Sequence, residues 1–222
     1  PIEYHLDGIS QTQVEPAKGY DFPSGLRAIV RQDPDVILVG EIRDQETAEI
    51  SLQASLTGHL VFSTLHTNDA AGTVARLVSL GAQTSTIASA INMAVAQRLV
   101  RKVCPKCAEF RTITTDLLEK LKQKLANLPD AVQPEKNSQS KIAQAKACPD
   151  CTSTGYRGRL GVFETFLVDQ ELEGLILANP STSDLKNKAR EKGMITLYQD
   201  GLLRVVQGLT TLEEVEKVVG ED

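Results

Sequence analysis

The chain has 222 residues, a formal net charge of −5 and an apolar content of 41%. This length allows one good core with a small appendage, or two modest domains. The mildly acidic charge provides no general attraction to nucleic acid or to an anionic membrane, and we expect no direct nucleic-acid binding. The N-terminus lacks the charged-then-apolar pattern of an export signal, and no apolar run of about 18 residues occurs, so we expect a cytoplasmic protein.

The first half of the chain predicts a βαβ unit. A helix is expected over residues 25–32, with Ser24 as its N-cap. The apolar run of residues 36–39, VILV, is then typical of a central parallel strand that is covered on both faces. Asp44 can cap a following helix, and residues 59–65 read as a second buried strand. Strand, helix and strand in about 30 residues predict a parallel crossover.

Two more helices are expected after the second strand. The first covers residues 69–80 and the second covers residues 84–101. The second has an apolar residue at every fourth position, which is typical of one helix face: Ile87, Ile91, Val95 and Leu99.

The composition changes between residues 102 and 158, which hold all four cysteines and a polar middle. We expect a helix over residues 117–128 and mobile chain over residues 129–146. The run LGVFETFLV at residues 160–168 predicts a return to strand. Four short helices then suggest a small bundle packed on the core: residues 169–178, 183–192, 196–207 and 211–220. The last of them begins with a capping box of Thr211 and Glu214.

A carboxylate follows the first predicted strand directly. Residues 34–44 read PDVILVGEIRD, so Glu41 stands just beyond the carboxyl end of the strand, where ligands of open α/β sheets bind. A carboxylate behind four buried residues is costly to desolvate and usually serves a cation. Glu41 is therefore a candidate for the acidic group that organises Mg²⁺ and phosphates in a nucleoside-triphosphate motor. The alternative is a strand that simply ends in a solvated glutamate.

The cysteines form two Cys-x-x-Cys knuckles separated by forty residues. Each knuckle can offer two thiolates to one tetrahedral ion, which predicts a closed and therefore structural Cys₄ zinc site. Two redox dithiols or an iron–sulfur centre are the alternatives. The predicted ligands are Cys104, Cys107, Cys148 and Cys151.

Two histidines bracket the second predicted strand. His59 and His66 are seven residues apart, and an odd separation on an extended strand places them on opposite faces, which makes them poor ligands for one metal. His66 falls at the same strand edge as Glu41, where an imidazole could sense a terminal phosphate. For either histidine, a simple hydrogen-bonded strand-end residue is the alternative.

A phosphate-binding loop is missing from the sequence. No Gly-Lys dipeptide occurs, so the chain holds no G-x-x-x-x-G-K-[ST] cradle. A strand-end glutamate cannot hold ATP alone. Either the protein does not act on nucleotides, or the cradle lies upstream of residue 1.

Taken together, these motifs resemble a known family. PIEYHLDGISQTQV and GLRAIVRQDPDVILVGEIRDQETAEISLQASLTGHLVFSTLHTNDA closely resemble the core of the type II secretion and type IV pilus assembly ATPases, hexameric motors of the secretion-ATPase superfamily. The similarity continues through QRLVRKVCPKC, CPDC, GYRGRLGVFE and GMITLYQDGLLRVVQGLTTLEEV, and so covers essentially the whole chain.

The resemblance implies an α/β fold with three parts. Residues 1–101 would form a partial RecA-like parallel-sheet core, residues 102–158 a tetracysteine zinc-binding insertion, and residues 159–222 a returning core strand and a small helical subdomain. It also implies a homo-hexamer that hydrolyses ATP with Mg²⁺, works with inner-membrane secretion or pilus components, and associates with the membrane only peripherally.

Roles are carried over by motif. Glu3 in PIEY corresponds to the acidic-box glutamate placed to activate the attacking water, and Glu41 to the atypical Walker B carboxylate that serves Mg²⁺. His59 and His66 correspond to the histidine box near the terminal phosphate. The four cysteines are typical of assembly and secretion motors rather than retraction motors.

The chain departs from the family pattern because the phosphate loop, the acidic residues before PIEY and the N-terminal domain are not in it. We therefore expect this piece alone to be inactive. The alternatives are a non-catalytic, zinc-stabilised interaction module and a DNA-uptake or transfer ATPase of the same superfamily.

Overall fold

The computed structural model describes residues 2, 4–129 and 141–221, and its chain divides into two compact units. The first unit runs to Met93 and also contains Leu167–Leu185. The second contains Ala94–Phe166 and the chain from Lys186 onward. Among the helices that the structure describes, none combines the length and the apolar character needed to cross a lipid bilayer.

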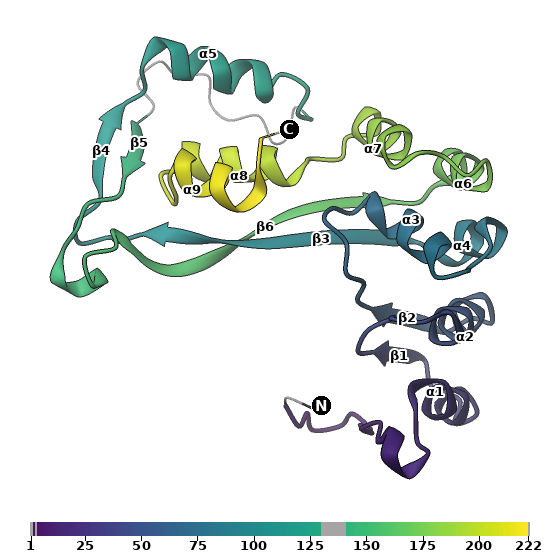
Figure 1. Ribbon diagram of the computed structural model, residues 1–222. Coiled ribbons are helices and arrows are strands. Elements are labelled where there is room, and N and C mark those ends of the chain that lie inside the picture. Colours follow the sequence, from purple (N-terminus) through teal and green to yellow (C-terminus); the bar gives the residue numbers. More distant parts are fainter. Residues whose placement is uncertain (1, 3, 130–140, 222) are drawn as a thin grey trace. The chain divides into compact units, whose positions relative to one another are not determined.

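The first unit is built around the predicted βαβ unit, which is confirmed (Figure 1). Strands β1 and β2 pair in parallel, from Val36 opposite Leu60 to Val39 opposite Ser63. Its elements are η1 (Pro16–Lys18), α1 (Phe22–Val30), β1 (Val36–Val39), α2 (Gln45–Leu56), β2 (Leu60–Ser63), α3 (Gly72–Ser79), α4 (Thr84–Ala90) and α6 (Gln170–Leu177).

Helices α1 and α2 pack on one face of the β1–β2 pair. Ile37 and Val39 are buried there in a cluster with Leu26 of α1 and Ala54 of α2. The prediction that both faces of this strand are covered is wrong for the described chain, because Val36 and Leu38 on the other face are 54% and 78% exposed.

The caps of α1 and α2 explain where these helices begin. The predicted cap of α1 is corrected: Asp21, not Ser24, is the N-cap, and its Oδ1 accepts the Ser24 N–H at 2.9 Å. Pro23 follows in the first turn, where its missing N–H costs nothing. The predicted cap of α2 is confirmed, since Asp44 accepts the Thr47 N–H at 2.8 Å.

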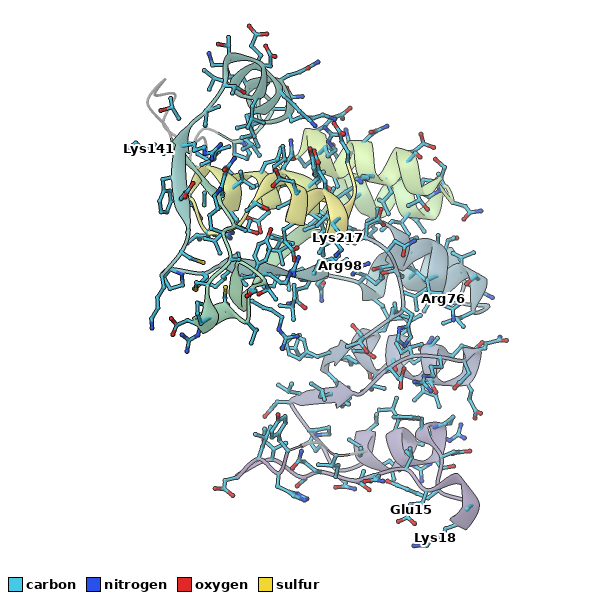
Figure 2. All side chains as sticks on the ribbon, turned by 60° about the vertical axis from the view of Figure 1, so that its left-hand side comes forward. Glu15, Lys18, Arg76, Arg98, Lys141 and Lys217 are labelled. Atoms are coloured by element: carbon cyan, nitrogen blue, oxygen red, sulfur yellow. The ribbon has the colours of Figure 1, made fainter. Side chains whose placement is uncertain are left out.

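The chain before α1 contains an exposed ion pair between Glu15 and Lys18, which spans the short helix η1 (Figure 2).

The predicted helix over residues 84–101 is wrong in its second half. Helix α4 ends at Ala90, and β3 (Met93–Val103) follows and pairs with β6 (Tyr156–Leu167). Residues four apart share a face in a strand as well as in a helix, so the spacing of Val95 and Leu99 fits both. The alternation of small buried residues with exposed ones, such as Ala94 and Ala96 around Val95, marks the strand.

The second unit holds the long strands, a small hairpin-like pair and three packed helices. Strand β4 (Glu109–Thr112) pairs antiparallel with β5 (Lys141–Gln144), so the expected mobility is wrong for residues 141–144. Residues 130–140 of that predicted mobile segment lie outside the described residues. Helices α5 (Thr115–Lys124), α8 (Leu197–Val206) and α9 (Leu212–Val219) share one apolar core, and α7 (Thr182–Glu191) spans the boundary between the units.

The helices after β6, predicted as one bundle, are divided between the two units. Helix α6 packs against α4 in the first unit, whereas α8 and α9 pack against each other in the second. The complete capping box also lies elsewhere than predicted, at Thr196 and Gln199 of α8. Thr211 does cap α9 by accepting the Glu214 N–H, but the Glu214 carboxylate binds Arg101 instead of closing the box.

The pairing of Arg101 with Glu214 joins β3 to α9 inside the second unit. Glu214 is 3% exposed, and its Oε1 accepts both the backbone N–H and the Nε–H of Arg101, at 3.0 and 2.9 Å. The guanidinium also lies 4.1 Å from the centroid of the Tyr156 ring. Burial alone would raise the pKa of Glu214, but the hydrogen bonds from Arg101 outweigh it and hold that pKa below the ordinary 4.5.

We predict that Arg101→Ala lowers the free energy of unfolding by about 2–4 kcal/mol, because it leaves a buried carboxylate with only the backbone donor. Urea denaturation measures this. Since the pKa of Glu214 is lowered on folding, the stability that this carboxylate contributes is fully present above pH 4.5 and is lost as the pH falls below that value.

Lys120→Ala is the control for this prediction. Lys120 forms an ion pair with Glu216, and the two side chains are 36% and 35% exposed. The control should change stability by less than about 1 kcal/mol. Equal losses in both variants would contradict the assignment.

Candidate functional site

The carboxyl ends of β1 and β2 are joined by hydrogen bonds just beyond the sheet. The Ile42 N–H donates to the Thr64 carbonyl at 3.0 Å, and Thr64 Oγ1 donates to the Gly40 carbonyl at 2.8 Å. These bonds extend the parallel pairing past the last strand residues. They bring Glu41 and His66, 25 residues apart in the sequence, to one rim.

Glu41 is the centre of this rim. Its Oε2 lies 3.2 Å from His66 Nε2 and 2.5 Å from Arg43 Nε. The hydrogen bond from Arg43 lowers the pKa of Glu41, and the hydrogen bond from His66 lowers it by a smaller amount. Burial acts in the opposite direction and is outweighed. The carboxylate is therefore ionised at neutral pH and is 25% exposed, while His66 is 79% exposed. An anionic oxygen donor open to solvent beside an imidazole can take a divalent cation and a phosphate group.

Arg43 lies within the PDVILVGEIRD motif, but no role is predicted for it from the sequence. The signal was available, because a basic residue two positions after a carboxylate in extended chain points to the same side. Asp69, by contrast, was expected near a helix start and is found there, with its Oδ1 accepting the Gly72 N–H at the start of α3 at 2.8 Å.

His59 is not brought to this rim. His59 precedes β2, at the opposite end of that strand from His66, and its Nδ1 lies 3.0 Å from the Ala54 carbonyl and 3.2 Å from Thr57 Oγ1. It thus binds the last turn of α2. Glu3 lies outside the described residues.

The four cysteines meet in the second unit. Their Sγ atoms all lie within 4.8 Å of one another, and three of the separations are 3.6, 3.8 and 3.9 Å. Four sulfurs at about 2.3 Å from one zinc ion, in a tetrahedron, are about 3.8 Å apart. All four cysteines are free, so no disulfide competes. The cluster therefore fits a single tetrahedral ion.

Each knuckle is a tight turn. The Cys107 N–H donates to the Cys104 carbonyl, and the Cys151 N–H to the Cys148 carbonyl within the 3-10 turn η3 (Pro149–Cys151), both at 3.3 Å. Burial, together with the neighbouring thiols, raises the pKa of Cys107 to about 12. Burial also acts to raise the pKa of Cys151, but backbone hydrogen bonding at Cys148 and Gly155 outweighs it and lowers that pKa to about 6. A bound cation is what would allow all four sulfurs to be thiolates together.

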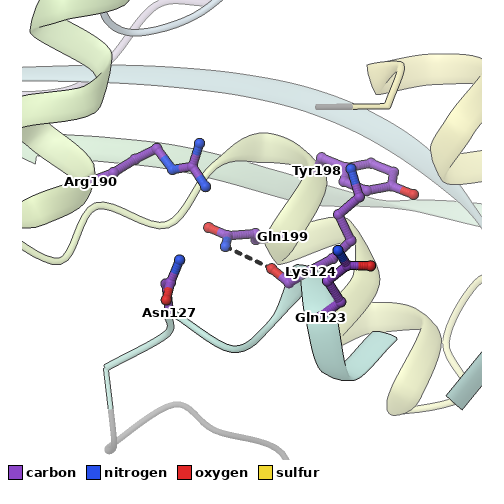
Figure 3. A pocket seen from close by; sticks show the side chains of 6 residues that line it. All are labelled: Gln123, Lys124, Asn127, Arg190, Tyr198 and Gln199. Atoms are coloured by element: carbon purple, nitrogen blue, oxygen red, sulfur yellow. Dashed lines mark hydrogen bonds between the residues drawn. The ribbon is translucent and has the colours of Figure 1, made fainter. Parts of the chain in front are cut away.

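A separate polar pocket lies between α5 and α8 in the second unit (Figure 3). Gln199 Nε2 donates to the Lys124 carbonyl across it at 3.0 Å, which ties the start of α8 to the end of α5. The pocket shares no residue with the rim or with the cysteine cluster. Its lining side chains are those of Gln123, Lys124, Asn127, Arg190, Tyr198 and Gln199.

Two solved structures have a similar mixed α/β fold. The Legionella pneumophila ATPase DotB matches with a TM-score of 0.64 over 98% of this chain and 48% of that chain, at 22% identity, which is a likeness of fold alone. The pilus retraction motor PilT with bound ADP matches with a TM-score of 0.58 over 89% of this chain and 43% of that chain, at 27% identity. This likeness of fold places the chain in the class of mixed α/β proteins to which the two solved structures belong.

The sequence comparison then names the family. The sequence model described as "Type II/IV secretion system protein" matches residues 1–217, and the chain belongs to this family. It is 45% identical to the type IV pilus assembly ATPase PilB of Thermus thermophilus over 97% of the chain and 23% of that relative. It is 46% identical to the type II secretion system ATPase E of Vibrio cholerae, over 100% of the chain and 42% of that relative. The resemblance stated from the motifs is confirmed, and the chain spans less than half the length of these relatives.

Proposed function

We propose that this chain is part of a cytoplasmic, homo-hexameric ATPase with a RecA-like core that drives type II secretion or type IV pilus assembly. The names of its relatives support this role. By the same reasoning we propose that it works peripherally at the inner membrane with secretion or pilus components. We also propose that the chain has three functional segments, which differ from the two compact units of the fold. They are a nucleotide segment (1–101), a metal segment (102–158) and a C-terminal segment (159–222).

One observation carries the catalytic part of this proposal. The Glu41 carboxylate and the His66 imidazole, 3.2 Å apart, share the rim where two parallel strands end. Polyphosphates bind at this edge of α/β sheets. Glu41 would hold Mg²⁺, which needs hard oxygen ligands and is often bound by one or two carboxylates together with the phosphates. When bound, Mg²⁺ neutralises negative charge on the phosphates.

The chain's own residues then have distinct roles. His66, largely exposed beside Glu41, would donate to the terminal phosphate and report its loss. Arg43 would keep the carboxylate ionised until the cation arrives. Two further roles rest on the family resemblance. Glu3 would activate the attacking water, and His59 would lie near the terminal phosphate. The contacts of His59 with α2 support an indirect contribution, through the start of β2.

The cysteine cluster is proposed as a structural zinc site. Four sulfur donors in tetrahedral proportions leave no open position for a substrate or a catalytic water. The ion would hold the end of β3 to the segment that leads into β6. No step of ATP hydrolysis needs it.

The experiment that tests this function compares ATP hydrolysis by the full gene product with hydrolysis by residues 1–222. We propose that the phosphate-binding loop is encoded before Pro1, so the gene product should hydrolyse ATP with Mg²⁺ and the 222-residue chain should show no rate above background. Hydrolysis by this chain at a motor-like rate would contradict the proposal. A gene product that also lacks Mg²⁺-dependent hydrolysis would favour a non-catalytic, zinc-stabilised interaction module.

A further inference from the structure

Gly155 contacts a cysteine of each knuckle through its backbone. It lies between η3 and β6, and it is buried. Its N–H donates to Cys151 Sγ at 3.2 Å, while its carbonyl accepts the Cys104 N–H at 2.9 Å. A single residue therefore ties the second knuckle to the first without using a side chain.

Only glycine fits this position. The backbone of Gly155 has φ +79°, a conformation that other residues adopt at a cost. A Cβ atom there would lie 2.8 Å from the Cβ of Ala145 and 3.1 Å from the carbonyl oxygen of Lys146. That carbonyl oxygen also lies 2.7 Å from Cys107 Sγ, which donates to it as a thiol and would be its close neighbour as a thiolate. A methyl group would therefore displace the backbone segment against which Cys107 is placed.

We propose that Gly155 is a positioning residue of the cysteine metal site. Four thiolates around a divalent cation carry a net charge of −2, and an N–H directed at one sulfur offsets part of it and fixes the direction of that ligand. The absence of a Cβ lets the Ala145–Lys146 segment approach, so that Cys107 faces the other three sulfurs. This inference rests on the proposed metal site and is independent of ATP hydrolysis.

The chain offers a matched control in Gly158. Gly158 also has a positive φ, +81°, but a Cβ atom there meets nothing within 4 Å. Gly158→Ala therefore introduces the same kind of backbone strain without crowding the cysteines. Comparison of Gly155→Ala with Gly158→Ala separates metal-site geometry from backbone strain.

The experiment measures the affinity of the 222-residue chain for Zn²⁺ by competition with a chelator, and the sulfur-to-metal charge-transfer band with Co²⁺. Gly155→Ala keeps the backbone N–H but should displace it and the Ala145–Lys146 segment, which should weaken Zn²⁺ binding about 10–100-fold, the usual cost of disturbing the outer shell, and should shift the Co²⁺ band. Gly158→Ala should keep the affinity within about threefold and leave the band in place. In the double variant Gly155→Ala with Ala145→Gly, removal of the nearest crowding atom should recover part of the affinity.

Unchanged affinity and an unchanged Co²⁺ band in Gly155→Ala would overturn the inference, as would equal losses in both single variants. If Gly155→Ala is too unstable to purify, the double variant decides. A Cβ at position 155 would still lie 3.1 Å from the Lys146 carbonyl oxygen, so the affinity of the double variant should stay below that of wild type, and affinity equal to wild type would count against the role of Gly155. A wild-type chain that binds no Zn²⁺ would instead contradict the proposed zinc site. That result is distinct from a failure of the role proposed for Gly155.

Discussion

Glu41→Gln is expected to reduce Mg²⁺-dependent ATP hydrolysis by the full gene product about 10²–10³-fold. The change keeps the size of the side chain but removes its charge, so the ligand for Mg²⁺ is lost. The contacts with Arg43 and His66, at 2.5 and 3.2 Å, also lose their charged acceptor. A coupled-enzyme assay of phosphate release at saturating ATP measures the effect.

Glu46→Gln is the control for this prediction. Glu46 is a carboxylate in the first turn of α2, and it binds Arg27 at 2.8 Å with more than half of its side chain exposed. Loss of this exposed pair should change hydrolysis by less than about twofold, because such pairs are worth about 1 kcal/mol or less and Glu46 is not part of the rim. If Glu41→Gln hydrolyses ATP as fast as wild type, the proposed role of Glu41 in the reaction is contradicted.

Removal of zinc is expected to destabilise the second unit and leave the first folded. Metal binding by a structural Cys₄ site is worth on the order of 10 kcal/mol, and the ion would join segments that are otherwise held by short turns. Chelation, or Cys107→Ser, should therefore lower the melting temperature of the second unit by at least about 10 °C. Calorimetry measures the transition, and metal analysis of wild type should give about one zinc per chain.

Ala147→Ser is the matched control, since it places a serine beside Cys148 at an exposed position and removes no thiolate. It should leave both zinc content and melting temperature unchanged. A chain that is as stable after chelation as before would rule out a structural role for the site.

The parts of the fold that follow from local patterns could be predicted from the sequence. The VILV run, its Asp44-capped helix and the next strand were predicted as a parallel βαβ unit, and Glu41 and His66 were expected at the same edge. The paired knuckles likewise indicated one four-sulfur cluster, which the structure brings together. In each case the chemistry and the spacing are contained in a short segment or in a repeated motif.

Three of the errors have one cause, which is dependence on distant partners. The spacing of Val95 and Leu99 fits helix and strand equally, and only pairing with β6, more than fifty residues later, decides in favour of strand. Glu214 has a capping-box position but binds Arg101, 113 residues away. Exposure of one face of β1 likewise depends on what else covers the sheet, which the pattern within a strand does not determine.

The central claim is that Glu41 and His66 receive the metal and the terminal phosphate of ATP. The most direct test is a crystal structure of the full gene product with Mn²⁺ and a non-hydrolysable ATP analogue, with the metal located by anomalous scattering. We predict an Mn²⁺ peak within about 2.2 Å of a Glu41 oxygen, or about 4 Å through one water, with the terminal phosphate next to His66. A nucleotide-bound Mn²⁺ at other carboxylates, with Glu41 still held by Arg43 and His66, would contradict it.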